Sequence, residues 1–381
     1  MLDISNRYYI LDESSEVEEK GVFSSIFFCC DRELDDQLCI VKKIYIPNIK
    51  DVNGFTFENA MNEVEIQQHL SNVGDEYMLD PVQIELEHLN QLKICNCTVQ
   101  PYENIVQYKW HKVEYDTNTK AKKSMKSATI YLVMEYCNGG DLGDYLKNTI
   151  RNLRHFGPIL MRNVVGQILN GYQFLRREEY IHGDLKPENI FIHNPRITNY
   201  IQYGEPCSST TDGYTNSSCK LHQDDCCCYW SVCCPGIIKI GDFGFSQSIG
   251  GELNARRIKT SRTTLHEKKN CVKGTPLYMA PEILWCNAES SSATDMWAIG
   301  LIGYECLYGK HPFDHCNDLE ELQSTMHNFK INTYKKKGNY TINDELWYQA
   351  TDFIKKCLKL APKRRPDSEN ALRHPIFKPI L

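Results

Sequence analysis

The chain has 381 residues, of which 41% are hydrophobic and 24% are charged, and its net charge is −6. This balance is ordinary for a globular protein, its slight acidity gives no indication of nucleic-acid binding, and no apolar run approaches the roughly 18 residues of a membrane span. Because the N-terminus also lacks the basic and apolar regions of a secretory signal, we expect a cytoplasmic protein, with the nucleus as the alternative, whose 18 cysteines are mostly thiols.

The first third of the chain is dominated by short β-like segments. Runs of β-branched and aromatic residues predict strands at 22–30, 38–46, 99–113 and 129–136. Residues 57–70 have apolar side chains at roughly helical spacing and predict a helix, whereas 71–98 show no clear pattern. A lysine-rich hairpin is expected at 114–127.

After the sequence Asn-Gly-Gly at 138–140, the pattern becomes helical. Helical spacing occurs at 142–146 and 159–177, and from residue 281 onward the chain is again helical, with 296–308 its most apolar element. The order of these segments predicts an α+β protein with two lobes: a small β-rich lobe, a glycine-bearing hinge and a larger, mostly helical lobe.

Residues 181–192 (Ile-His-Gly-Asp-Leu-Lys-Pro-Glu-Asn-Ile-Phe-Ile) carry the strongest chemical signal. Asp184, Lys186 and Asn189 can place a base, a cation and a neutral oxygen ligand around one reacting hydroxyl. An Asp and an Asn five residues apart would alone fit a capped turn. The full string, however, resembles the catalytic loop of protein kinases.

Other strings resemble kinase motifs and follow in the family's order. Residues 238–244 (Ile-Lys-Ile-Gly-Asp-Phe-Gly) resemble the metal-binding element, and residues 274–282 resemble the end of the activation segment. In the family, the glutamate at this position, here Glu282, pairs with a distant arginine that Arg365 matches. Asp295 matches the aspartate of the central helix that supports the catalytic loop.

The resemblance implies ATP and Mg²⁺ as cofactors and assigns a role to each site residue. Asp184 would accept the proton of the substrate hydroxyl, and Lys186 would neutralise charge on the moving phosphoryl group. Asn189 and Asp242 would hold Mg²⁺.

In the small lobe, Lys42 resembles the lysine that grips the α- and β-phosphates. Its glutamate partner is expected to be Glu63, in the helix predicted after this strand. Glu65 is an alternative, and so is Glu85, because 71–98 could hold the helix instead.

Residues 131–142 resemble the hinge between the lobes. Backbone groups of Glu135 and Cys137 would bind adenine, with Met134 behind it and Asp141 near the ribose. A buried strand followed by a turn would have the same composition, so this assignment depends on motif order.

The resemblance covers nearly the whole chain and predicts its domain organisation. The expected parts are an N-terminal extension at 1–15 and a kinase domain at 16–379, with the N-lobe at 16–136, the hinge at 135–141, the C-lobe at 142–379 and a cysteine-rich insert at 194–236.

The implied function is a serine/threonine protein kinase that acts on protein substrates. Lys186 and the string at 274–282 favour serine and threonine over tyrosine, and the same string disfavours a small-molecule kinase. The alternative is a pseudokinase scaffold, which would bind protein partners with weak or no phosphoryl transfer.

Two departures from the family pattern change the expected behaviour. Only Gly21 remains of the three glycines that cover the phosphates, which predicts weaker ATP binding. Gly183 stands where most members have an arginine that binds a phosphate on the activation segment. We therefore expect activity largely independent of phosphorylation at the candidate sites Thr260, Ser261, Thr263 and Thr264.

The insert at 194–236 contains seven cysteines. They could bind Zn²⁺ together with His222, but no two Cys-x-x-Cys pairs occur at finger-like spacing, so a flexible insert is favoured. Glu188 and Asp141 match positions that hold substrate arginines in some relatives, which predicts a preference for basic residues N-terminal to the phosphorylated site.

Overall fold

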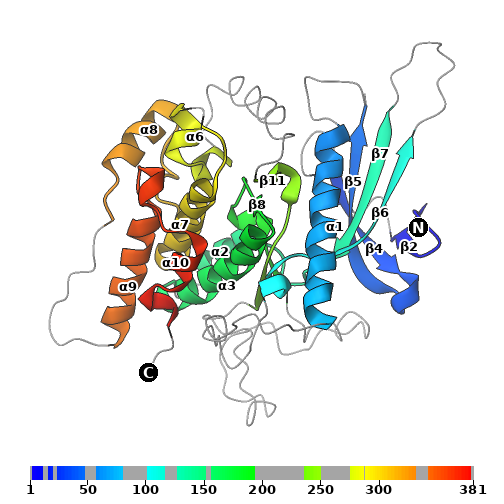
Figure 1. Cartoon of the computed structure of the whole chain (residues 1–381), viewed down its shortest axis with the longest axis horizontal. Helices are drawn as coiled ribbons and strands as arrows, with labels where there is room; N and C mark the ends of the chain where they lie inside the picture. The colour runs from blue at the N-terminus through cyan, green and yellow to red at the C-terminus, as the bar shows by residue number, and fades with distance from the viewer. Residues whose placement is uncertain are drawn as a thin grey trace, which may run out of the picture.

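The computed structural model shows a molecule of two lobes (Figure 1). It describes residues 2–11, 16–19, 24–47, 57–79, 101–115, 127–151, 156–193, 236–249, 275–286, 288–331 and 342–378.

The small lobe is an antiparallel sheet packed against one long helix. The sheet order is β1 (Leu2–Asp3), β2 (Tyr8–Ile10), β4 (Ser24–Asp31), β5 (Gln37–Ile46), β7 (Ala128–Glu135) and β6 (Tyr108–Tyr115), and β3 (Glu16–Glu19) also pairs with β4. Helix α1 (Phe57–Leu79) crosses one face of this sheet (Figure 1).

Side chains along strand β5 point alternately to the two faces of the sheet, and each face packs into its own apolar cluster. Ile44 and Ile46 pack in the cluster that includes Val64 of α1. Cys39 and Val41, of the opposite parity, pack in a second cluster on the other face of the sheet. Ile40 and Lys42 are left to face the space between the lobes.

The predicted strands at 22–30, 38–46 and 129–136 correspond closely to β4, β5 and β7. The strand predicted at 99–113 is wrong in its first half, because Pro101–Asn104 form a 3₁₀ turn before β6 begins. Buried Asn104 donates its side-chain amide to the Ile238 carbonyl, 2.6 Å away, which anchors this turn outside the ladder. The helix predicted at 57–70 continues to Leu79.

The expected N-terminal extension is part of the sheet. Tyr8, Tyr9 and Ile10 of β2 pair with residues 29–31 of β4, beside the stretch of β4 that pairs with β3. Residues 2–10 therefore complete an edge of the small lobe instead of preceding it. Residues 12–15 of the expected extension lie outside the described residues.

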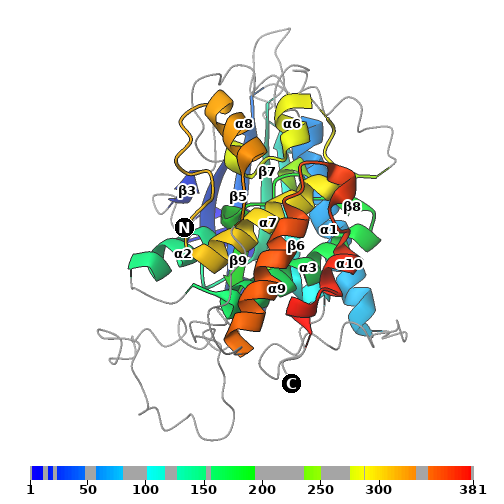
Figure 2. The same ribbon diagram turned by 90° about the vertical axis from the view of Figure 1, so that its left-hand side faces the viewer.

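The large lobe is built around α7 (Ser292–Tyr308), which is buried along most of its length. Around it lie α2 (Leu142–Arg151), α3 (Pro158–Arg177), α6 (Pro281–Cys286), α8 (Leu319–Asn328), α9 (Ile342–Cys357) and α10 (Ser368–Leu372). Figure 2 shows α9 and α10 on the outer side of this lobe. Gly309 ends α7 in a left-handed conformation with φ of 73°, where glycine has no steric penalty. None of the helices among the described residues is both long and apolar enough to cross a membrane.

Two short antiparallel pairs bring the central loops of the large lobe together. Strand β9 (Ile190–His193) pairs with β10 (Ile237–Ile240), and β8 (Tyr180–Ile181) pairs with β11 (Gln247–Ser248). The segments that follow β8 and β10 are therefore held side by side at the boundary between the lobes.

Candidate active site

The backbone of the loop after β8 is fixed by the central helix α7. The amides of His182 and Gly183 donate to the two carboxylate oxygens of Asp295, at 2.8 and 2.9 Å. Burial raises the pKa of Asp295 to about 6, although both backbone donors lower it. The Asp295 carboxylate thus fixes the orientation of the loop backbone at His182 and Gly183.

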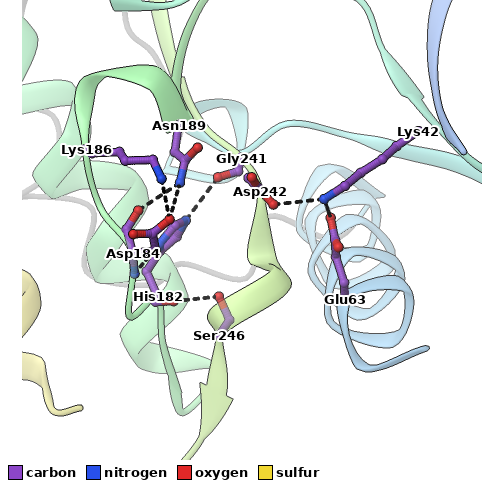
Figure 3. A network of polar contacts seen from close by, with 9 residues as sticks. All are labelled: Lys42, Glu63, His182, Asp184, Lys186, Asn189, Gly241, Asp242 and Ser246. Atoms are coloured by element: carbon purple, nitrogen blue, oxygen red, sulfur yellow. Dashed lines mark hydrogen bonds and ion pairs between the residues drawn. The ribbon is translucent and has the colours of Figure 1, made fainter. Parts of the chain in front are cut away.

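His182 connects this loop to the segment after β10. Its Nδ1 accepts from the Asp184 amide at 3.3 Å, so Nε2 carries the proton and donates to the Gly241 carbonyl at 3.0 Å. Burial lowers the pKa of His182 to about 4, which keeps the ring neutral. The carbonyl of His182 accepts from the Ser246 hydroxyl at 3.1 Å (Figure 3). The loop after β8 is therefore hydrogen-bonded to the segment after β10 at two points, Gly241 and Ser246.

Asp184 is the centre of one polar group. Its Oδ2 accepts from the Lys186 ammonium at 2.7 Å and from the Asn189 amide at 3.1 Å (Figure 3). Burial raises the pKa of Asp184 to about 6, while Lys186 lowers it and Asp242 raises it. A carboxylate whose pKa lies near neutral pH, and which is held in place by a hydrogen bond from a cation, is suited to accept a proton.

Lys42 is the centre of the second group. Its ammonium contacts Glu63 of α1 at 2.6 Å and Asp242 at 3.0 Å (Figure 3). Burial alone would lower the pKa of Lys42, but the carboxylates of Asp242 and Glu63 outweigh it and raise the pKa. Of the glutamates considered from the sequence, Glu63 makes this contact, Glu65 is exposed, and Glu85 lies outside the described residues.

A cleft extends from the Lys42 group to the connection between the lobes. Its polar end is formed by Lys42, Glu63 and Asp242, and its other end by the backbone after β7. The full lining is Ile26, Ile40, Lys42, Glu63, Val106, Met134, Glu135, Tyr136, Cys137, Gly140, Asp141, Phe191, Gly241 and Asp242. Mostly apolar walls with a charged end fit a ligand that is flat at one end and anionic at the other.

Lys239 is a site residue that sequence reasoning missed. Its ammonium, buried in β10, contacts the Glu135 carboxylate at 2.9 Å, and that carboxylate also accepts from the backbone amide of Gln107 at 2.7 Å. The Glu135 side chain is thereby held between the lobes. A lysine within an apolar strand was the available signal, because a buried lysine requires an anionic partner.

Gly183 has a backbone that only glycine adopts readily. Its φ is +80°, and a Cβ at this position would lie 2.8 Å from the Phe245 carbonyl oxygen. An arginine here would have a strained backbone and would also require a shift of the Phe245 backbone. The glycine therefore fits the close approach of the segment after β10.

Asn189 and Asp242 fit a magnesium ion by donor type. They offer an amide oxygen and a carboxylate oxygen, the hard donors that Mg²⁺ prefers. The Asn189 amide nitrogen is directed to Asp184, which turns its oxygen away from that carboxylate. Across the described ranges, no group of three or more His, Cys, Asp or Glu side chains is arranged to hold a metal.

Several candidate residues lie outside the described residues. These are Gly21, the four hydroxyl residues at 260–264, and the cysteines and His222 of the insert. Two carboxylates considered for substrate binding are described. Asp141 accepts from the Asp144 amide at 2.9 Å at the start of α2, whereas Glu188 has a buried carboxylate oxygen with no hydrogen-bond partner among the described residues.

Comparisons with known proteins agree with this geometry. Residues 19–377 match the family model described as "Protein kinase domain". The chain is 32% identical over 254 residues to the "Probable serine/threonine protein kinase IRE" of Arabidopsis thaliana, and the matched region covers 66% of this chain and 19% of that protein. It is 29% identical over 259 residues to "Serine/threonine-protein kinase unc-51" of Caenorhabditis elegans, covering 66% of this chain and 23% of that protein. It is 32% identical over 185 residues to human "Serine/threonine-protein kinase ULK1", covering 49% of this chain and 13% of that protein. The chain thus spans less than a quarter of each of these relatives.

Proposed function

Because the chain belongs to the protein kinase family, we propose that it transfers the γ-phosphoryl group of ATP to serine and threonine hydroxyls of proteins. The observation that carries the proposal is a pair of polar groups: Asp184 bonded to Lys186 and Asn189, and Lys42 bonded to Glu63 and Asp242 at the polar end of the cleft. These groups match the parts that phosphoryl transfer requires.

In this proposal, ATP lies along the cleft, with its adenine at the connection between the lobes and its phosphates at the polar end. Backbone groups of Glu135 and Cys137 bind adenine, and Asp141 lies near the ribose. Lys42, held by Glu63, takes the α- and β-phosphates, and Asn189 with Asp242 holds Mg²⁺. The bound metal supplies charge neutralisation on the phosphate oxygens.

Asp184 and Lys186 act on the reacting groups. Asp184 orients the substrate hydroxyl and takes its proton, and Lys186 stabilises negative charge on the transferring phosphoryl group. His182 and Asp295 do not touch substrate in this scheme, but they keep Asp184 in position through the loop backbone.

The alternative, a pseudokinase scaffold, is the less favoured reading. Loss of chemistry in a kinase fold is expected among the groups that hold phosphate, metal and hydroxyl, and all of them are present in this chain. The Lys42–Glu63 pair is also formed. The depleted glycine loop argues for weaker ATP binding and does not remove a reacting group.

The direct test is phosphate transfer from γ-labelled ATP to a mixed peptide library with Mg²⁺. We expect labelled serine and threonine peptides, enriched in basic residues N-terminal to the site because Glu188 and Asp141 match positions that hold substrate arginines in some relatives. Nucleotide binding without transfer would favour the scaffold, and label on tyrosine alone would contradict the substrate class.

The pH dependence of kcat/KM should reflect Asp184. Since the pKa of Asp184 is raised to about 6 by burial, the protonated and inactive form should accumulate below that pH. Lys186 lowers this pKa, so Lys186→Met should move the acid limb to higher pH as well as reduce the rate. The measurement is kcat/KM between about pH 5 and pH 8, in steps of about half a pH unit.

Lys356→Met is the control for this experiment, because Lys356 lies on α9 and pairs with Asp352 at 2.7 Å, away from the cleft. Its acid limb should match that of the unmodified protein. A limb that does not move in Lys186→Met would contradict the role of Asp184 as the titrating base.

Activity should depend little on phosphorylation of the activation segment. Gly183 has no side chain to bind a phosphate there. Replacing Thr260, Ser261, Thr263 and Thr264 with alanine should therefore leave kcat nearly unchanged in the same peptide assay. A large fall in kcat would show that these hydroxyl groups are needed.

A further inference from the structure

Two cysteines lie directly opposite each other in the small lobe. Cys29 of β4 and Cys39 of β5 are paired in the antiparallel register. Directly opposed residues in such a ladder have Cα atoms about 4.5 or 5.5 Å apart, and both separations fall within the roughly 4.4–6.8 Å that a disulfide spans. Their side chains project from the same face of the sheet.

That face is the one turned away from the cleft. Cys29 and Cys39 are both fully buried, in a cluster that includes Val41, Tyr8 and Ile10. Their neighbour Ile40, of the opposite parity, lines the cleft instead. The two thiols therefore have no part in the proposed phosphoryl transfer.

The two thiols are chemically unequal. The Cys39 thiol donates to the Gln37 carbonyl at 3.6 Å, and its pKa is lowered chiefly by the neighbouring Cys29 thiol, with burial opposing this effect and the nearby Lys109 charge adding to it. Cys39 is thus the better nucleophile of the two, and Cys29 is placed to react with it next.

We propose that Cys29 and Cys39 form an oxidisable pair, which a hydroperoxide converts into an intramolecular disulfide between β4 and β5. The Cys39 sulfur attacks one peroxide oxygen, the O–O bond breaks, and one water leaves as Cys39 becomes a sulfenic acid. The Cys29 sulfur then attacks the Cys39 sulfur, the S–O bond breaks, and a second water leaves. Two thiols lose two protons and two electrons, and hydrogen peroxide is reduced to two waters.

The N-terminal segment controls access to this pair. Ile10 of β2 pairs with Cys29, and the segment is fastened by Arg7, whose guanidinium donates to both carboxylate oxygens of buried Asp31 at 2.7 and 2.6 Å. A peroxide can reach the thiols once β1 and β2 separate together from β4. The rate of oxidation should therefore depend on the Arg7–Asp31 pair.

The decisive measurement is peptide mapping of the full chain after treatment with hydrogen peroxide and alkylation of the remaining thiols. Trypsin cuts after Lys20, Arg32 and Lys42, so the pair falls on two peptides, 21–32 and 33–42. We expect these peptides to be joined without reductant and separated with it, and fragmentation to locate the bond at Cys29. A bond at Cys30, or no joined peptide while Cys29 and Cys39 are both alkylated, would overturn the proposal.

Matched variants test the assignment and the access route. Cys30 pairs with Leu38 and so faces the other side of the sheet; Cys30→Ala should keep the joined peptides, whereas Cys29→Ala should lose them. Arg7→Ala should accelerate their formation, whereas Arg373→Ala, which breaks an exposed pair with Glu369, should not. Joined peptides in Cys29→Ala would disprove the pairing, and an unchanged rate in Arg7→Ala would disprove control by the N-terminal segment.

Discussion

Replacing Asp184 with asparagine should lower kcat by about 10²–10⁴-fold, the usual contribution of a positioned acid–base group. The dissociation constant for Mg-ATP should change little, because Lys42, Asn189 and Asp242 remain. Asparagine has nearly the same shape and can still accept from Lys186, which now contacts Asp184 at 2.7 Å. It has no basic oxygen that could take the substrate proton.

Single-turnover phosphate transfer and nucleotide titration together check this prediction. Asp35→Asn is the matched control, since Asp35 is exposed at the turn after the 3₁₀ helix Arg32–Leu34 and has a φ of 50°, a conformation that asparagine tolerates. It should retain full activity. If Asp184→Asn transferred phosphate at the normal rate, or lost ATP binding together with activity, the assignment of Asp184 as the base would be wrong.

The sequence predicted the site best where the chemistry lies within a few consecutive residues. Asp184, Lys186 and Asn189 come from one loop, so their spacing alone brings them near one point. Lys42 and Glu63 could be paired because an alternating strand followed by a helix places both on facing surfaces. The choice of Glu63 over Glu65 depends on which side of α1 meets the sheet, and the weak periodicity of 57–70 left that open.

Features that depend on pairing between distant segments could not be predicted. The contact of Lys239 with Glu135 joins β10 to the end of β7, and the local pattern indicates that Lys239 needs an anionic partner without identifying Glu135 as that partner. The role of residues 2–10 in the sheet depends on register with β4, which short strands do not specify. Gly183 was recognised as an unusual residue, but its positive φ and the nearby Phe245 carbonyl became evident only in three dimensions.

The second large effect is expected on stability, at the ion pair between α6 and the segment before α10. Arg365 donates to both oxygens of Glu282 at 2.6 and 2.8 Å, and also to the carbonyls of Lys359 and Ala293 at 2.7 and 2.8 Å. Its side chain is 0% exposed, and its guanidinium lies 5.0 Å from the centre of the Trp297 ring. This one side chain therefore satisfies acceptors from several separate segments of the large lobe.

Arg365→Met should lower the free energy of unfolding by about 3–5 kcal/mol, the cost of leaving the partner of a buried ion pair uncompensated. Methionine fills part of the volume but leaves the Glu282 carboxylate and the two carbonyls without their donor. Arg373→Met provides the comparison: its pair with Glu369 is 2.5 Å long but more than half exposed, and should be worth less than about 1 kcal/mol. Urea denaturation of both variants gives the two values, and adding Glu282→Gln to Arg365→Met should restore part of the loss because it removes the unpaired charge. Equal losses in the buried and the exposed variants would mean that burial of the Glu282 pair does not set its contribution.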